Sequence, residues 1–272
     1  MKKTLFVLFF IPYFAASQNI FVNYSAPIAA IICAGGHQTS PCGGFTTITD
    51  ARDGKVYNVV QTGTGKGIQC WMAENLNYST SGSYTAIHGG AQLAGEKYCQ
   101  NLSGVDDASC PFGGLYEWAN MMNGSSGCNG DSACPPCLIP IQGICPSGWH
   151  IPSHYEWTLL EKNAGSNPGA FHYNVTDGGF FGTNEGSNLK QAGTANWTAP
   201  NAAATNSTGF TALPGGDSWF GGFQYNGTQG AWWSTTETAG LAWLRDLVDT
   251  NAGVLRGWNN EAFGHSVRCI KN

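Results

Sequence analysis

Short β-type runs, rather than long amphipathic helices, dominate the pattern of apolar and polar residues along this chain. Residues Val56–Val60 and Ile68–Met72 are rich in β-branched, sulfur-containing and aromatic side chains, and a Gly-rich turn at 63–67 joins them. From residue 210 onward, similar runs alternate with polar turns. The strands expected there are Phe210–Leu213, Ala231–Ser234, Leu241–Val248, Val254–Arg256 and Ser266–Ile270, with a hairpin loop at 249–253.

Helical spacing of apolar residues occurs at only a few places. Ala91–Leu102 and Leu115–Met122 are compatible with short helices. The clearest helix begins at Ser153, because Ser153 and Glu156 form a capping box that satisfies the free N–H groups of a helix start. Residues 165–209 are mostly Gly, Asn, Thr and Ala, which predicts long loops around a turn at Leu189–Lys190. The expected class is α+β, with few short helices and an antiparallel C-terminal sheet.

The N-terminus has the three parts of an export signal. Lys2 and Lys3 precede an apolar stretch from Thr4 to Ala16, and small residues form a cleavage site before Gln18. We expect a signal peptide at 1–17, an N-terminal extension at 18–45 and one domain at 46–272. No later apolar run reaches the roughly 18–20 residues of a membrane span, so no membrane insertion is expected after removal of the signal.

The amino-acid composition limits the classes of molecule that this protein can be expected to bind. Only 29 of 272 residues are charged (11%), the net charge is −5, and Lys2-Lys3 is the longest basic run, which argues against nucleic acid as a partner. Hydrophobic residues still make up 42%, so the chain can bury a core. Gly accounts for 38 residues, about twice the usual share.

Ten cysteines in an exported chain favour disulfides over free thiols. Nine of them precede residue 146, and only Cys269 lies near the end, so Cys269 must pair far back in the sequence. The pairing of the other cysteines does not follow from their spacing. The cysteines left unassigned are Cys33, Cys42, Cys70, Cys128, Cys134 and Cys137.

Three motifs invite a chemical interpretation, and each has a simpler structural one. The Gly-rich stretch 63–67 precedes a strand-like run rather than a helix, so it predicts a hairpin turn and not a phosphate loop. His150 and His154 have zinc-helix spacing, but Pro152 and the helix cap lie between them. Cys134-x-x-Cys137 lies in a Pro-rich loop, which favours structural pairing over redox activity. We therefore expect no enzyme activity, no cofactor and no metal.

Several sequence blocks resemble the Fibrobacter succinogenes major paralogous domain family. The N-terminal blocks are Asp53–Tyr57, Trp71–Tyr78 and Cys145–Ser153 followed by Glu156-Trp157. The C-terminal blocks are Gly209–Gly216, Trp232–Thr236, Ala242-Trp243 with Arg245, and Ser266–Lys271. The resemblance covers residues from about 46 to the end, and the blocks stand in the family's order.

This resemblance implies a secreted or surface-exposed protein with a disulfide-linked, C-type-lectin-like fold and no defined biochemical activity. Cys145 and Cys269 both lie in family blocks, and we expect them to form a disulfide, with Cys99–Cys110 as a local second pair. The Cys145–Cys269 bond would close a large loop and offset the entropy lost in ordering the Gly-rich segments. A buried Cys269 thiol is the alternative.

Aromatic residues supply the candidate binding site. Six tryptophans lie in or beside expected elements and are assigned to the core: Trp71, Trp118, Trp149, Trp157, Trp232 and Trp233. Trp197, Trp219 and Trp258 lie in expected loops, where they either stack on a sugar or plug their own loops. The candidate ligand-binding residues are Trp219, Trp243, Arg256, Trp258, Asn259, Asn260 and Glu261. Trp258-Asn259-Asn260 is similar to the Trp-Asn-Asp of calcium-dependent lectins, but the Asp is missing and we expect no tight calcium site.

The leading hypothesis is a non-catalytic binding or adhesion protein of the cell exterior, with a glycan or a cell-surface protein as its ligand. A first alternative is a self-associating subunit of an extracellular filament or surface layer, for which low charge, high Gly content and many disulfides are also suitable. A second alternative is an enzyme similar to formylglycine-generating enzymes, which share a lectin-like fold. It would need two reactive cysteines together, and no partner thiol for Cys269 is evident.

Overall fold

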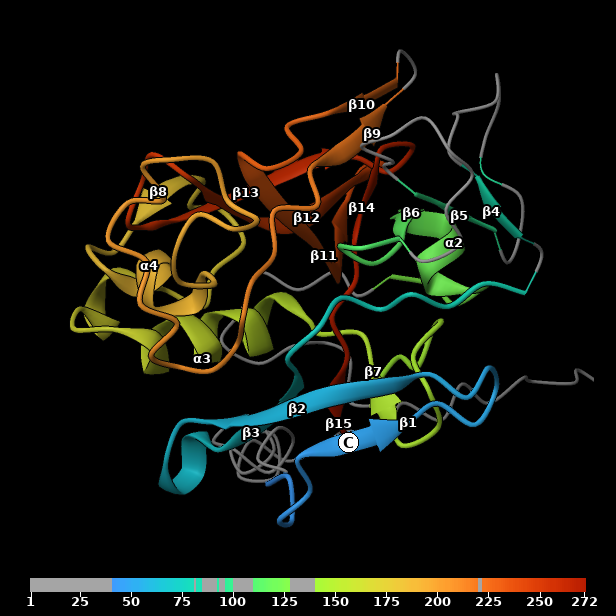
Figure 1. Ribbon diagram of the computed structural model, residues 1–272, viewed down its shortest axis with the longest axis horizontal. Helices are drawn as coiled ribbons and strands as arrows, with labels where there is room; N and C mark the ends of the chain where they lie inside the picture. Colours follow the sequence, from blue (N-terminus) through green and yellow to red (C-terminus); the bar gives the residue numbers. More distant parts are fainter. Residues whose placement is uncertain are drawn as a thin grey trace, which may run out of the picture.

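The computed structural model describes residues 41–80, 82–84, 92, 96–99, 110–127, 140–219 and 222–272. Within them the chain is mostly β-sheet with few short helices (Figure 1). The expected signal peptide, Cys33, Cys128 and the Cys134-x-x-Cys137 motif lie outside the described residues. No helix in the described part of the chain is long and apolar enough to cross a membrane.

A five-stranded antiparallel sheet contains the N-terminal strands and the last strand of the chain. Its order is β1 (Thr47–Thr49), β2 (Val56–Thr62), β3 (Gln69–Met72), β15 (Ile270–Lys271) and β7 (Trp149–His150). The Gly-rich stretch forms the turn between β2 and β3 and contains the short 3-10 helix η2 (Gly65–Gly67), so the predicted hairpin is confirmed. A Cβ at Gly63 would lie 2.1 Å from the Gly67 carbonyl oxygen, which is why only glycine fits there.

A larger ten-stranded sheet forms the other half of the molecule. The strands along its main path are β4 (Gly82–Tyr84), β5 (Glu96–Tyr98), β6 (Leu115–Glu117), β14 (Gly264–Ser266), β11 (Gln229–Thr238), β12 (Leu241–Val248), β13 (Val254–Asn260) and β8 (Gly179–Phe181). A hairpin of β9 (Asp217–Trp219) and β10 (Gly222–Gln224) joins this path at β14. The sheet is mixed, because β14 runs parallel to β11 and β4 runs parallel to β5.

Helix α3 (His154–Ala164) lies between the two sheets (Figure 1). It begins at the predicted capping box: the Ser153 hydroxyl accepts from the Glu156 N–H, and the Glu156 carboxylate accepts from the Ser153 N–H. Its apolar side carries Trp157 and Leu160 into a core formed by both sheets. The other helices are α2 (Trp118–Met122), α4 (Glu185–Leu189) and the 3-10 helix η3 (Pro168–Ala170).

Two hydrophobic cores hold the sheets together. The core around α3 contains Trp71, Trp157 and Trp232. The second core surrounds α2 and the Cys145–Cys269 bond, and it contains Trp118, Trp149 and Trp233. All six tryptophans that the sequence assigns to the core are therefore buried.

Two segments that the local spacing of apolar residues predicts as helices form strands instead, wholly or in part, because they pair with distant strands. Residues 96–98 form strand β5 rather than part of a helix at Ala91–Leu102, because β5 pairs with β4 on one side and with β6 on the other. The expected helix at Leu115–Met122 is also partly wrong. Its first three residues form β6, which pairs with β14, and only Trp118–Met122 is helical.

Two expected C-terminal strands also differ. Phe210–Leu213 contributes only an isolated bridge between Ala212 and Lys190, and the buried Arg268 side chain donates to the carbonyls of Phe210 (2.6 Å) and Thr211 (2.8 Å). The guanidinium therefore supplies these two carbonyls with the hydrogen bonds that a neighbouring strand would otherwise donate. Residues Ser266–Ile270 are divided between β14 and β15, which belong to different sheets.

Three disulfides lie within the described residues. Cys145–Cys269 and Cys99–Cys110 are the two pairs expected from the sequence, and Cys42–Cys70 is a third. Cys145–Cys269 links the segment before α3 to the segment between β14 and β15, with a sequence separation of 124. Cys42–Cys70 links the start of the described chain to β3 with a separation of 28.

We predict that replacing Cys145 and Cys269 with alanine lowers the free energy of unfolding by up to about 5 kcal/mol, because the unfolded chain regains the entropy of a long loop. The matched double variant of Cys42 and Cys70 should lose about 1 kcal/mol less, since its loop is shorter. Guanidinium unfolding of both variants under non-reducing conditions measures the difference. An equal or larger loss for the Cys42–Cys70 variant would contradict this loop-entropy account.

Candidate functional site

One face of the large sheet collects the polar and aromatic residues that form the candidate site. Trp243 lies directly opposite Trp258, and Arg245 lies opposite Arg256, in the register of β12 and β13. Because alternate residues of a strand share a face, these four side chains project to the same side. Helix α3 covers most of this face.

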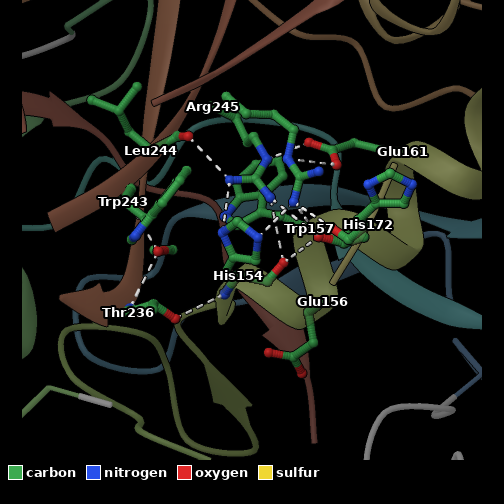
Figure 2. Close-up of polar contacts among 12 residues, drawn as sticks. His154, Glu156, Trp157, Glu161, His172, Thr236, Trp243, Leu244 and Arg245 are labelled. Carbon is green, nitrogen blue, oxygen red and sulfur yellow. Dashed lines mark hydrogen bonds and ion pairs between the residues drawn. The ribbon is translucent and has the colours of Figure 1, made fainter. Parts of the chain in front are cut away.

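The polar side of α3 faces Arg245 and Arg256. His154, Thr158 and Glu161 are spaced i, i+4 and i+7, so they form one stripe along the helix. Figure 2 shows Glu161, Arg245 and His154 converging in the space between α3 and the sheet. All three residues are at least 98% buried.

Glu161 lies between the two guanidinium groups. Its carboxylate contacts Arg245 Nε, and its second oxygen lies 3.7 Å from Arg256 Nε. The Thr158 hydroxyl accepts from Nη2 of Arg256 (3.1 Å) and of Arg245 (3.3 Å), and it donates to the His154 carbonyl (2.8 Å). The helix and the two strands are thus joined by a single polar network.

His154 is held in its neutral form. Burial lowers its pKa well below the ordinary value, and the positive charges of Arg245 and Arg256 lower the pKa further. Arg256 Nη2 lies 2.6 Å from His154 Nε2, and Arg245 Nη1 lies 3.4 Å from Nδ1. A neutral imidazole has one accepting nitrogen, so only one of these contacts can be a hydrogen bond.

The network carries more positive than negative charge. Burial lowers the pKa of Arg245 to about 10 and also lowers that of Arg256, yet both groups stay protonated at neutral pH. One carboxylate therefore faces two buried cations. A carbonyl of the neighbouring loop compensates in part, because Arg256 Nη2 donates to the His172 carbonyl at 2.7 Å.

This network supports an aromatic stack that reaches the surface. The Trp243 indole is buried, with its ring centre 4.8 Å from that of His154 in a T-shaped contact. Trp258 packs on Trp243 at 5.1 Å, also edge to face, and its side chain is 48% exposed. On its other side Trp258 lies close to Gly178, where a Cβ would be 3.0 Å from the ring. The exposed indole is therefore positioned by groups on two sides.

The structure separates the seven ligand-binding candidates. Trp258 and Asn260 are exposed and lie on the same face of β13, where a ligand can reach both. Trp243 and Arg256 are at least 99% buried, so in this structure neither of these expected ligand contacts presents a surface to a ligand. Trp243 packs against both His154 and Trp258, and Arg256 contacts His154, so both residues lie behind the exposed indole.

The remaining candidates lie elsewhere. Asn259 projects to the opposite face of β13, where its Nδ2 lies 3.2 Å from His265 Nε2. Glu261 follows β13 and contacts Glu237; burial raises the pKa of Glu261, and the Glu237 carboxylate raises it further. Trp219 is 42% exposed but belongs to the β9–β10 hairpin. Trp197, expected in an exposed loop, is 1% exposed and donates its Nε1–H to the Ala212 carbonyl.

Sequence reasoning missed the residues that position the exposed indole. His154 was considered only as a metal ligand, Arg245 only as part of a family block, and Thr158 and Glu161 not at all. The i, i+4, i+7 spacing of three polar residues on a helix with an otherwise apolar side was the available signal. Among the described residues, no group of three or more His, Cys, Asp or Glu side chains is placed to hold a metal.

Fold and site together define a disulfide-linked, mostly β domain that presents an exposed tryptophan above a buried charge network. A family model described as the Fibrobacter succinogenes major domain matches residues 66–271, or 206 of the 272 residues. The chain therefore belongs to this family. The match includes α3, both arginines and Trp258. No curated protein and no solved structure matches the chain.

We predict that Glu161→Gln lowers the free energy of unfolding by about 3–5 kcal/mol, because two buried guanidinium groups lose their carboxylate partner. The control is Asp177→Asn, which removes a half-buried carboxylate that pairs with His172 and acts on Arg256 only through its charge. Thermal unfolding should show a large drop in Tm for the first variant and a much smaller one for the second. A Glu161→Gln protein as stable as the wild type would contradict the assigned role of Glu161.

Proposed function

We propose that this protein is a non-catalytic binding protein of the cell exterior that recognises glycans through the exposed face of Trp258. A single exposed tryptophan is common on protein surfaces and needs no functional explanation by itself. The observation that carries the proposal is the support behind this ring. Trp243, His154 and two arginines fix its position from within the protein.

A fixed, half-exposed indole is suited to a sugar ring. One face of a pyranose is lined with C–H groups and can cover the apolar ring, while hydroxyl groups at the edge of the sugar need hydrogen-bonding partners. Asn260 is exposed two residues along the same strand and offers an amide beside the indole. Because the indole is already ordered, little side-chain entropy is lost when a ligand binds.

Cell-exterior location is supported by the cysteines and the N-terminal pattern. Three disulfides within the described residues are typical of an oxidising environment. The export signal expected at 1–17 agrees with such a location. We further propose the C-type-lectin-like fold that the family resemblance implies.

The enzymatic alternative is disfavoured by the position of Cys269. An enzyme similar to formylglycine-generating enzymes would need a reactive thiol there, whereas Cys269 is bonded to Cys145 and is fully buried. The pair links two segments of the core and has no exposed surface. We therefore propose a structural role for this disulfide.

We predict that Trp258→Ala weakens glycan binding about 30-fold, because truncating a tryptophan at the centre of a binding surface costs about 2 kcal/mol. Affinity electrophoresis in gels containing xylan, β-glucan, mannan or hydroxyethylcellulose measures binding as retardation of the native protein. The polysaccharide that retards the wild type then serves to compare the variants.

The control is Phe45→Ala, which removes a 63% exposed aromatic ring near the five-stranded sheet. Its retardation should equal that of the wild type. Absence of retardation by every polysaccharide would contradict the proposed ligand class. Equal retardation of wild type and Trp258→Ala would contradict the proposed site.

A further inference from the structure

Two buried carboxyl groups connect the β9–β10 hairpin to the centre of the large sheet. Asp217 belongs to β9 and Asp246 to β12, and they are 4% and 6% exposed. The amide of Gln224 donates to the first carboxyl group and that of Gln229 to the second. The Oδ1 atom of each aspartate is buried without a hydrogen-bond partner among the described residues.

Two ionised carboxylates at this position would be costly. Buried charges normally require a paired cation or a full set of hydrogen bonds, and neither aspartate forms an ion pair within the described part of the chain. A bound Ca²⁺ would need six to eight oxygen ligands. Among the described residues, no third His, Cys, Asp or Glu joins the two aspartates in a group that could hold a metal ion. Uptake of a proton is the compensation that this geometry allows.

The surroundings of the pair favour protonation. Burial raises the pKa of Asp217 to about 6 and that of Asp246 to about 7, and the charge of Asp217 adds to the rise for Asp246. The adjacent Arg245 projects to the opposite face of β12, toward Glu161. On β14, burial lowers the pKa of His265 to about 3, so its ring is neutral. β10 and β11 contribute the neutral Gln224 and Gln229.

We propose that the Asp217–Asp246 pair takes up a proton below neutral pH and acts as a latch, which fixes the β9–β10 hairpin against the sheet and releases it at higher pH. The latch goes beyond the proposed glycan site at Trp258, because it acts on a different element. Opening of the latch would change the position of Trp219, the exposed tryptophan at the end of β9.

The described residues show few other connections that would resist release of the hairpin. Among them, β9 pairs with β14 through Ser218 and Gly264, Gly216 just before β9 bridges to Gly230, and the Gly216 N–H donates to the Gln229 carbonyl (2.8 Å). Phe223 contributes one edge-to-face contact with Tyr98 at 6.4 Å. In Figure 1 the hairpin lies at the periphery of the large sheet, above β11 and β14. Repulsion between two ionised aspartates at its base therefore acts on a weakly held element.

The direction of the pH effect follows from the raised pKa values. In the unfolded chain both aspartates ionise near pH 4. The stability contributed by the protonated pair is therefore fully present below about pH 4 and is lost as the pH rises through about 6 to 7. Opening of the hairpin should follow the same window.

Hydrogen exchange of the full-length protein measured by mass spectrometry tests the latch. Protection factors of the amides at 217–219 and 222–224, corrected for intrinsic rates, should fall at least about tenfold between pH 5 and pH 8. In Asp246→Asn the hairpin should stay protected at pH 8, because the neutral amide removes the repulsion. Asp217→Asn should behave in the same way, which guards against an effect peculiar to one substitution.

The control is Asp249→Asn, a buried acid just after β12 that forms no contact with the pair within the described residues and should keep the wild-type pH dependence. Equal protection of the wild-type hairpin at pH 5 and pH 8 would overturn the proposal. So would recovery of protection at pH 8 on addition of millimolar Ca²⁺, because a cation and not a proton would then join the two strands. Binding of polysaccharide at Trp258 is a separate measurement, and its failure leaves this test unaffected.

Discussion

The contact between Glu161 and the arginines of β12 and β13 determines how the two halves of this protein fit together. Helix α3 presents Trp157 and Leu160 to the core between the sheets, which fixes its apolar side by burial. The polar side chains of the helix are then also removed from water, which costs free energy unless charged groups of the sheet pair with them. Arg245 and Arg256 supply those partners, and the cost of burying three charges makes the arrangement specific, since any rotation of the helix would separate them. The positions of Trp243 and Trp258 follow from this constraint.

In other parts of the fold, buried Lys and Arg side chains supply hydrogen-bond donors to backbone carbonyls. Five of the nine Lys and Arg residues whose burial is described are no more than 1% exposed: Lys97, Lys190, Arg245, Arg256 and Arg268. Lys190 donates to the carbonyls of Val248 and Asn251, and Arg268 donates to those of Met72, Phe210 and Thr211. The carbonyls of Asn251, Phe210 and Thr211 belong to loop residues and thus find donors inside the protein, while those of Met72 and Val248 lie at the ends of strands β3 and β12. Within the described part of the chain, this burial leaves four Lys and Arg side chains at the surface: Arg52, Lys55, Lys162 and Lys271.

Elements defined by local chemistry could be predicted from the sequence. The capping box fixes the start of α3, and the β-branched and aromatic run at Leu241–Val248 is one strand, β12, with the expected limits. What the sequence did not reveal depends on partners far along the chain. Glu96–Tyr98 is a strand because β4 and β6 lie on either side, and β14 runs parallel to β11 through the pairing of Trp232 with Ser266. For the site, the exposure of Trp258 and Trp219 could be foreseen. The burial of Arg256 could not be foreseen, because it depends on α3 packing over the face of β13 that carries this side chain.

The place of β15 in the five-stranded sheet has a consequence for the order of folding. β15 lies between β3 and β7, although β3 ends at Met72 and β15 begins at Ile270. Until residue 270 has been synthesised, β3 and β7 lack the strand that joins them, and Cys145 lacks its partner sulfur. Such distant pairing makes folding slow and leaves strand edges open in the meantime. A chain built in this way cannot complete the five-stranded sheet or close the Cys145–Cys269 loop until almost its whole length is available, so final folding follows synthesis rather than accompanying it.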